Sequence, residues 1–428
     1  MNFKKLIQRY REGTATAEER KLVEQELEKY ESIEEYLTED LDERFIPGEA
    51  SEKGEDPHHT RRGPGEDFNI RQLVNRRLRR VILTSVVIVV LLYVTIFYGI
   101  SALVDQTHYD PSAVTKAEEG EYPRTDFHFD ITAYVSLNMP GYSLASFTPT
   151  DSQGFGNYEI HYPLRDLFTR ERQGHRVDIS RSRLAYADGG IFDIQHRHNL
   201  WEGFDLIRYP GTFESEDMGR EEAEEHLQRE TRRKNEITKE YLDEMNPLSY
   251  LSMHMVFEED LSMLEFLHLS REHRDLEFKW VGIRTNAEGT RWSENQPQHL
   301  IGFNPNPGDE PSGNSRPAPE EYPLFYLGDL WDENLRHDDD FAEMYETHFH
   351  SRLRYLSGRQ EFIEIFDYNI YKEDFYQQAL EYVEDQGIYT YGVVVHGTAG
   401  DFREALEDLP YESLFIHEAL PLSPNIYY

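Results

Sequence analysis

The feature that most constrains this chain is an uncharged apolar run at residues 81–104, within "RRLRRVILTSVVIVVLLYVTIFYGISALVD". A helix needs about 20 apolar residues, at 1.5 Å each, to cross a hydrocarbon core of about 30 Å. The Val and Ile content would favour a strand in water, but a lone strand in lipid would leave its backbone unpaired. The run therefore predicts a transmembrane helix over residues 81–104.

Two other interpretations of this run fit the sequence less well. A core helix of a soluble protein seldom stays apolar on every face over such a length. A cleaved signal peptide occupies the first 15 to 30 residues or so of a chain. Here about eighty residues precede the run.

Basic residues flank the run on one side only. Arg76, Arg77, Arg79 and Arg80 come just before it, whereas Asp105 follows it. Because Lys and Arg are retained on the cytoplasmic side, we expect a cytoplasmic N-terminus and an extracytoplasmic C-terminal domain in the cell membrane. The same arginines could contact nucleic acid, but they lack interleaved aromatic residues, and membrane lipid is the partner they predict.

The span divides the 428 residues into parts that need separate interpretations. The predicted fold class is a short all-α cytoplasmic head, one transmembrane helix, and a mixed α+β extracytoplasmic domain. The linker is predicted from its content of Gly, Pro and charged residues. The expected boundaries are a helical head at 1–46, a flexible linker at 47–67, a basic juxtamembrane segment at 68–80, the transmembrane helix at 81–104, and an extracytoplasmic α+β region at 105–428.

Charge and cysteine content exclude several classes of protein. The formal net charge is −38, which argues against direct binding of DNA or RNA by the body because phosphates would be repelled. The chain contains no cysteine, so it has no disulfide to stabilise an exported domain. Packing must supply that stability.

The head, "MNFKKLIQRYREGTATAEERKLVEQELEKYESIEEYL", contains clear helix signals. Leu6 and Tyr10 recur at helical spacing, and Gly13 then ends a first helix. Thr16 begins a second helix, in which Glu19 completes a capping box. Apolar residues of the second helix fall on one stripe, at Leu22, Val23, Leu27, Tyr30, Ile33, Leu37 and Leu41.

A domain as small as the head encloses little volume, so two amphipathic helices cannot bury both stripes well against each other. We therefore expect part of the apolar surface to face a partner. A self-contained helical hairpin that merely precedes the membrane is the alternative.

The order of these parts resembles the sigma factor regulator family, the membrane-anchored anti-sigma factors of Gram-positive bacteria. The N-terminal part of the resemblance lies in "FKKLIQRYREGTATAEERKLVEQELEKYESIEEYL" and in "FNIRQLVNRRLRRVILTSVV". The C-terminal part lies in "NPLSYLSMHMVFEEDLSMLEFLHL", "LEFKWVGIRTN" and "ALEYVEDQGIYTYGVVVHGT". The region between them and several acidic insertions are not covered.

The resemblance implies that the head binds an extracytoplasmic-function sigma factor and covers the surfaces that the factor needs for RNA polymerase. Many anti-sigma domains carry a zinc site of His and Cys, but this chain has no cysteine and no cofactor is expected. Another membrane protein or a protease is a further expected partner. The residues expected to contact the sigma factor are Leu6, Tyr10, Leu22, Val23, Leu27, Tyr30 and Leu37.

Beyond the span the sequence is typical of a mixed α+β domain. Alternation at Phe127, Phe129 and Ile131 predicts a strand, and "MPGY" predicts a turn after it. Gly387 and Gly392 bracket a change from helix to strand. The remaining predicted elements are strands in "SYLSMHMVF", "LEFKWVGI" and "TYGVVVHG", and helices in "DMGREEAEEHLQRETRRKNEITKEYLDEM", "FAEMYETHFHSRLRYLSG" and "DFYQQALEYVEDQG".

An enzyme or a metal site finds little support in the residues. His196 and His198 would share one side of a strand, whereas His348 and His350 would diverge on a helix, and neither pair has a third ligand at a recognisable spacing. The run "HDDDF" lacks the spacing of an EF-hand loop, so we expect its acids to be solvated. "GFGNYE" lacks the context of a dinucleotide fingerprint.

Two classes of function therefore remain. One is a transmembrane regulator of transcription that sequesters a sigma factor in response to an envelope signal, without enzyme activity. The other is a membrane-anchored extracytoplasmic binding protein or enzyme whose head only assists placement.

Overall fold

The computed structural model describes residues 15–16, 21, 23, 66–114, 124–192, 200–204, 220–286, 299–310, 315–330, 337–367 and 374–424. The chain divides into two units, Met1–Leu83 and Thr84–Tyr428. Most of the predicted head and linker lies outside the described residues. Within the head, Lys21 and Val23 are helical.

The apolar run is helical, as predicted. Helix α3 (Glu66–Val94) continues as a short π-helical segment, Thr95–Ile100, and as α4 (Ser101–Asp105). Over Arg77–Asp105 the helix is long and apolar enough to cross a membrane, and its most apolar stretch is not buried against the rest of the chain.

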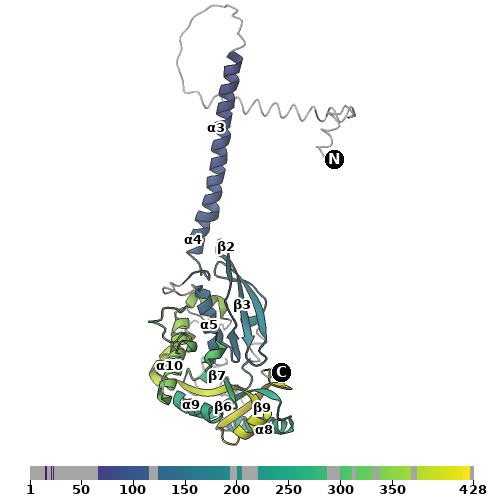
Figure 1. The fold of residues 1–428 in the computed structure, drawn as a ribbon, viewed down its shortest axis with the longest axis vertical. Helices are drawn as coiled ribbons and strands as arrows, with labels where there is room; N and C mark the ends of the chain where they lie inside the picture. The colour runs from purple at the N-terminus through teal and green to yellow at the C-terminus, as the bar shows by residue number, and fades with distance from the viewer. Residues whose placement is uncertain are drawn as a thin grey trace, which may run out of the picture. The chain divides into compact units, whose positions relative to one another are not determined.

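The first sheet, which the sequence did not predict, consists of antiparallel hairpins. Strands β1, β3, β4 and β5 lie in that order, and β2 also pairs with β3. Figure 1 shows the β2–β3 hairpin beside the end of α4. The strands are β1 (Tyr142–Leu144), β2 (Thr150–Gly154), β3 (Asn157–Asp166), β4 (Arg172–Ser180) and β5 (Leu184–Ala187).

The second sheet contains the three strands that were predicted from the sequence, now β6, β7 and β9. Its order is β10-β6-β9-β7-β8, with antiparallel neighbours throughout. Gly392 on the central strand allows a close approach, because a Cβ there would lie 2.3 Å from the carbonyl oxygen of Met255. The strands are β6 (Tyr250–Ser262), β7 (Glu277–Ile283), β8 (Ile301–Phe303), β9 (Tyr389–Thr398) and β10 (Tyr411–Leu420).

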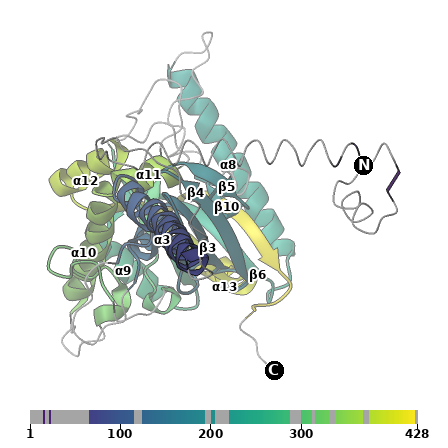
Figure 2. The same ribbon diagram turned by 90° about the horizontal axis from the view of Figure 1, so that it is seen from above.

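Helices cover this second sheet, and three of them, α8, α10 and α12, were predicted. In Figure 2, α9, α10 and α12 lie on one side of the body, and α8 runs beside β10 on the other. The described helices of the body are α5 (Asp126–Asn138), α8 (Arg220–Glu244), α9 (Met263–Glu272), α10 (Asp338–Ser357), α11 (Gln360–Phe366), α12 (Phe375–Gln386) and α13 (Ala399–Ala405), with 3-10 turns at Gly190–Phe192, Pro307–Asp309 and Leu327–Leu330.

The charged helix α8 covers the edge of the second sheet. Asn235 donates to the carbonyl oxygen of Glu412 at 2.8 Å and accepts from the amide of Leu414 at 3.0 Å. One side-chain amide thus satisfies a backbone carbonyl and a backbone amide of the edge strand β10, which would otherwise be free to pair with another chain.

The predicted strand at residues 127–137 is wrong, because this segment is the helix α5. Phe127, Phe129 and Ile131 are buried as expected, but His128 and Asp130 between them are fully buried too. A helix that is covered on every side has no exposed face to reveal its period of 3.6 residues. The apolar alternation therefore resembled that of a half-buried strand.

An ion cluster joins the two sheets at Asp309. Lys279 of β7 donates to this carboxylate at 2.9 Å, and Arg170, in the turn between β3 and β4, donates to it at 3.0 Å. Burial raises the pKa of Asp309, but the charge and hydrogen bond of Lys279 outweigh burial and hold the pKa below its usual value. Asp309 is therefore an ionised link between the sheets.

Candidate functional site at the base of the apolar helix

The C-terminal end of the apolar helix is docked on the tip of the β2–β3 hairpin. The hydroxyl oxygen of Ser101 accepts from the amide of Phe155 at 2.8 Å, and Asp105 accepts from the amide of Gly156 at 2.7 Å. The ring of Phe97 meets that of Phe155 edge to face, with centroids 6.0 Å apart. Phe97, Ser101 and Asp105 are spaced by four residues, so they lie near one face of the helix.

The hairpin tip has an unusual backbone that fits this contact. Gly154, Phe155 and Gly156 have φ angles of 77°, 56° and 72°. A bulky residue with positive φ is strained and persists only where its surroundings hold it. The hydrogen bonds that the amides of Phe155 and Gly156 donate to Ser101 and Asp105 supply that restraint.

A second anchor lies just beyond the helix, at Tyr109. Its amide donates to the hydroxyl of Ser182 at 2.9 Å, and its own hydroxyl donates to Asp130 of α5 at 2.7 Å. Its ring packs against Phe362 and Phe366 of α11. Tyr109 thus fastens the segment after the helix to the core of the body.

Asp130 is the centre of a buried polar cluster. Arg359 binds it with two donors, Nε at 2.6 Å and Nη2 at 2.9 Å, and the hydroxyl of Tyr355 donates to it at 2.8 Å. Burial raises the pKa of Asp130, while the hydrogen bonds and charge of Arg359 oppose that rise. The fork of two donors matches an ionised carboxylate, so the pair is ionic.

The tyrosines of this cluster remain protonated donors. Burial first, and then the charge of Asp130, raise the pKa of Tyr109 and of Tyr355 well above the usual value. The two oxygens of the Asp130 carboxylate together have partners from the segment after the helix, from α10 and from Arg359 just before α11. The cluster holds these elements together.

The hairpin tip and Tyr109 together give the apolar helix two attachments to the body. One is on the first sheet, and the other is on the packed core around α5. Because protein cores are close-packed, a shift of the core has a direct physical route to the helix through these contacts.

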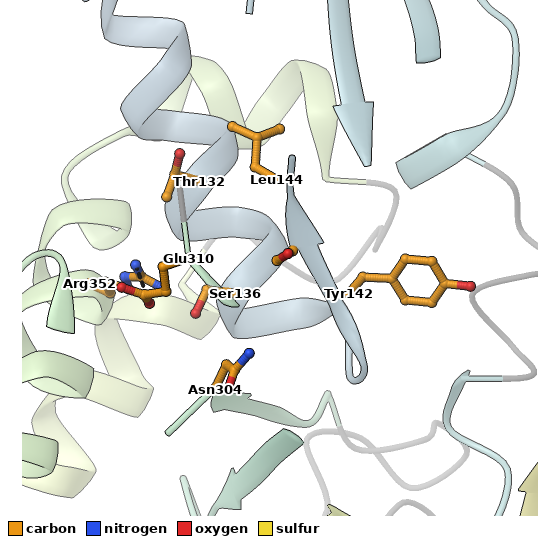
Figure 3. Close-up of a pocket in the computed structure, with 8 residues that line it drawn as sticks. Thr132, Ser136, Tyr142, Leu144, Asn304, Glu310 and Arg352 are labelled. Carbon is orange, nitrogen blue, oxygen red and sulfur yellow. Dashed lines mark ion pairs between the residues drawn. The ribbon is translucent and has the colours of Figure 1, made fainter. Parts of the chain in front are cut away.

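A second polar cluster lies beside a cavity of about 10 Å³ that Figure 3 shows in close-up. The buried Glu310 pairs with Arg352 at 2.7 Å and accepts from the amide of Leu327 at 2.9 Å. Ser136 Oγ and Asn304 Nδ2 are buried there and have no hydrogen-bond partner among the described residues. The space fits one water molecule, so this cavity is too small for an organic ligand.

A larger hollow of about 240 Å³ lies on the first sheet. Its lining includes the phenol of Tyr142, the carboxylates of Asp166 and Asp188, and the imidazole of His175. His175 is 3.6 Å from Asp188. Within the described ranges, no group of three or more His, Asp or Glu side chains is arranged to hold a metal ion.

The structure describes one of the two histidine pairs named from the sequence. His348 is buried and bonds to the carbonyl of Leu324, whereas His350 bonds to Glu384 near the surface, so the two diverge as expected. His196 and His198 lie outside the described residues.

The acids of "HDDDF" form the first turn of α10. As expected, they remain accessible to solvent, with the side chain of Asp338 43 % exposed; Asp338 also pairs with Arg271 and with His268, and Asp340 accepts from the amide of His337. They favour the start of the helix by capping and by their charge.

Of the residues expected to contact a sigma factor, the structure describes Val23, which is helical with a 2 % exposed side chain. Leu6, Tyr10, Leu22, Leu27, Tyr30 and Leu37 lie outside the described residues. Of the topology residues, Arg77, Arg79 and Arg80 are helical and exposed, and Arg76 is helical.

Sequence analysis missed the residues that form the base of the helix. Tyr109 and Asp130 are 21 residues apart and carry no motif. A charged residue within the apolar run "FHFDITAYVSL" was a usable signal, because an acid among buried residues needs a partner. The tip "GFG" was noticed only as an incomplete nucleotide motif.

The polar clusters around Asp130 and Asp309 fasten structural elements of the body to one another. Residues 242–411 match the family model described as Sigma factor regulator C-terminal. These residues are therefore similar to the C-terminal part of sigma factor regulators, in agreement with the resemblance in the sequence, and the match supports a role in sigma factor regulation. No curated protein and no solved structure matches it.

The match begins near the end of α8 and ends at the first residue of β10. It therefore contains the core of the second sheet together with α9, α10, α11 and α12. The apolar helix, Tyr109, helix α5 and the first sheet precede the matched residues, whereas Tyr355 and Arg359, which bind Asp130, lie within them.

Proposed function

We propose that this chain is a membrane-anchored anti-sigma factor. The head binds an extracytoplasmic-function sigma factor in the cytoplasm, the apolar helix crosses the cell membrane once, and the body lies outside. The observation that carries the proposal is the family match at residues 242–411, in one chain with a helix at Arg77–Asp105 that is long and apolar enough to span.

The chemistry of the head supports this role. Sigma factors present basic surfaces beside apolar grooves, and an acidic amphipathic helix complements both. Leu22, Leu27 and Tyr30 are proposed as apolar contacts of that helix, with its acidic residues as the rim. Without cysteine, the head binds through these contacts and not through a zinc site.

The base of the helix supports a sensory role for the body. An envelope signal that shifts the core around α5 reaches the helix through Asp130 and Tyr109, and through the hairpin contact at Asp105. Release of the sigma factor then follows from a conformational shift or from cleavage by a membrane protease.

Co-purification tests the first step. The head, expressed as residues 1–46, should capture a sigma factor from a lysate of the source cells, and the body should not. If the head captures none while the body retains a ligand, the protein is an anchored binding protein instead. The hollow of about 240 Å³ beside Tyr142 is the observation that favours this second function.

Protease protection tests the topology. Protease added to intact protoplasts should digest the chain beyond about residue 110 and spare the head, because the arginines before the span stay inside. Digestion of the head would overturn the proposed orientation.

Truncation tests the division of roles. A chain without residues 120–428 should still repress, since covering the sigma factor needs only the head, but it should lose its response to envelope stress. A regulon that is fully active with an abundant, inserted truncated protein would show that the body is required to hold the sigma factor.

A further inference from the structure

The tip of the β2–β3 hairpin lies beside a part of the apolar helix that is well before its end. Phe155 contacts Phe97, which precedes Asp105 by eight residues, or about 12 Å along a helix. Counted from residue 81, the roughly 20 residues that cross a hydrocarbon core end near Ile100. If the helix spans a membrane, Phe97 lies within the apolar layer and Phe155 lies at its boundary.

The β4–β5 turn of the same sheet lies next to the tip of the β2–β3 hairpin. A Cβ on Gly156 would be 3.4 Å from Cγ of Arg181 and 3.5 Å from Cγ1 of Val104. The β4–β5 turn and the end of the helix therefore both lie against the hairpin tip. Ser182 in this turn holds the amide of Tyr109.

This turn has the opposite charge to most of the protein. Arg181 and Arg183 are exposed, and neither has an ionic partner within the part of the chain that the structure describes. Leu184, which follows, exposes 39 % of its side chain. In a chain of net charge −38, two free guanidinium groups beside an apolar helix need a local explanation.

We propose that this end of the body rests on the outer surface of the membrane. Phe155 inserts at the boundary between acyl chains and headgroups, and Arg181 and Arg183 bind the phosphates of anionic lipid headgroups. Guanidinium groups bind phosphate with paired donors, and an aromatic ring is favoured at the interface. The inference rests on the membrane span proposed above and adds a lipid-binding surface to the body.

The strained backbone of the tip fits this role. Phe155 has a positive φ between two glycines that adopt the same conformation, and its half-buried ring lies against Phe97 at the level where the helix leaves the apolar layer. The hydrogen bonds from Ser101 and Asp105 fix the tip to the helix, and so fix its depth relative to the lipid.

The absence of cysteine makes a direct test simple, because a single introduced cysteine is the only site that a thiol probe can label. The full chain is placed in nanodiscs of phosphatidylcholine, with or without phosphatidylglycerol. An environment-sensitive fluorophore is attached at Gln153→Cys, an exposed position beside the tip, and is quenched by lipids that carry a nitroxide. Ile96→Cys in the helix and Leu422→Cys after β10 are the matched controls.

We expect strong quenching at Ile96→Cys, intermediate quenching at Gln153→Cys, and none at Leu422→Cys. Adding Arg181→Gln and Arg183→Gln to the Gln153→Cys protein should weaken docking on anionic discs by about fivefold per arginine. The same pair of substitutions should have little effect on discs of phosphatidylcholine alone.

Other outcomes overturn the inference in distinguishable ways. If Gln153→Cys is quenched no more than Leu422→Cys while Ile96→Cys is quenched, the hairpin tip does not rest on lipid. The proposed transmembrane helix would be supported in that case. If Ile96→Cys also escapes quenching, the span itself fails, and the inference fails with it. Equal docking of the arginine variants on anionic discs would exclude phosphate binding by Arg181 and Arg183.

Discussion

The hydroxyl of Tyr109 donates a hydrogen bond of 2.7 Å to Asp130, and this joins the segment after the apolar helix to a helix buried at the centre of the body. Tyr109 is 4 % exposed and Asp130 is fully buried. The bond is therefore made in a medium of low dielectric constant, where a lost partner leaves a costly unpaired group.

Removing this hydroxyl should loosen the connection without removing the aromatic packing. Tyr109→Phe keeps the ring contacts with Phe362 and Phe366 but loses a hydrogen bond to a charged group, so the free energy of unfolding should fall by about 1.5–3 kcal/mol. Unfolding in denaturant, followed by the fluorescence of the buried Trp280, measures the change. Tyr241→Phe, on the exposed face of α8, is the control and should have no effect.

Neutralising the carboxylate should cost more than removing the tyrosine hydroxyl. Asp130→Asn leaves the guanidinium of Arg359 with the more distant carboxylate of Asp126, at 3.6 Å, and breaking a buried ion pair on one side costs about 3–5 kcal/mol. The same denaturant experiment should give this variant a lower free energy of unfolding than Tyr109→Phe. Equal stability of the two variants would mean that Arg359 is paired by other groups.

Removing the side chains that hold the hairpin tip should free its backbone. In Ser101→Ala with Asp105→Ala, the amides of Phe155 and Gly156 lose their acceptors, each worth about 1 kcal/mol, so hydrogen exchange should speed by about fivefold at each. Exchange at Ile160, within β3, is the internal control and should not change. Unchanged exchange at the tip would show that the helix does not hold it.

Buried histidines should make the body less stable in acid. Burial lowers the pKa of His128 and of His254 to about 3, with further lowering by Arg124 and by His417 respectively. Below the unfolded pKa of about 6.5 the unfolded chain therefore binds protons that the folded chain does not, and stability falls as pH falls.

The expected loss between pH 7.5 and 5.5 is about 1.4 kcal/mol for each such histidine. His254→Gln should reduce the total loss by that amount, in unfolding curves recorded at the two pH values. A pH dependence identical to that of the unaltered protein would show that His254 has the same pKa in the folded and unfolded states.

In the head, replacing one of the proposed apolar contacts should lower the affinity for the sigma factor. Leu27→Ala or Tyr30→Ala should weaken sigma binding by about 1–4 kcal/mol if these residues are interface hot spots. Calorimetric titration of the helical head with the captured sigma factor measures the affinity, and Gln25→Ala, off the apolar stripe, is the control. Full affinity in both variants would place the stripe inside the head.

The sequence by itself determined the elements that carry a local signal, such as a long apolar run, a helical period or a break at glycine. The uncharged run before Asp105 predicted the apolar helix because its length and composition alone meet the requirement of a bilayer. The strands β6, β7 and β9 and the helices α8, α10 and α12 were also predictable, because runs of β-branched residues, helical periodicity and the break at Gly387 are local signals.

Only the tertiary structure decided the fold of a segment that is buried on all sides and the partners of its polar residues. Helix α5 was taken for a strand because burial on every face hides the helical period, and Asp130 showed its partners only once α10 and α11 packed against it. The contacts of Tyr109 with Asp130 and of Asp105 with Gly156 join residues that are distant in sequence. Local patterns do not record such pairs, because they depend on which elements the folded core brings together.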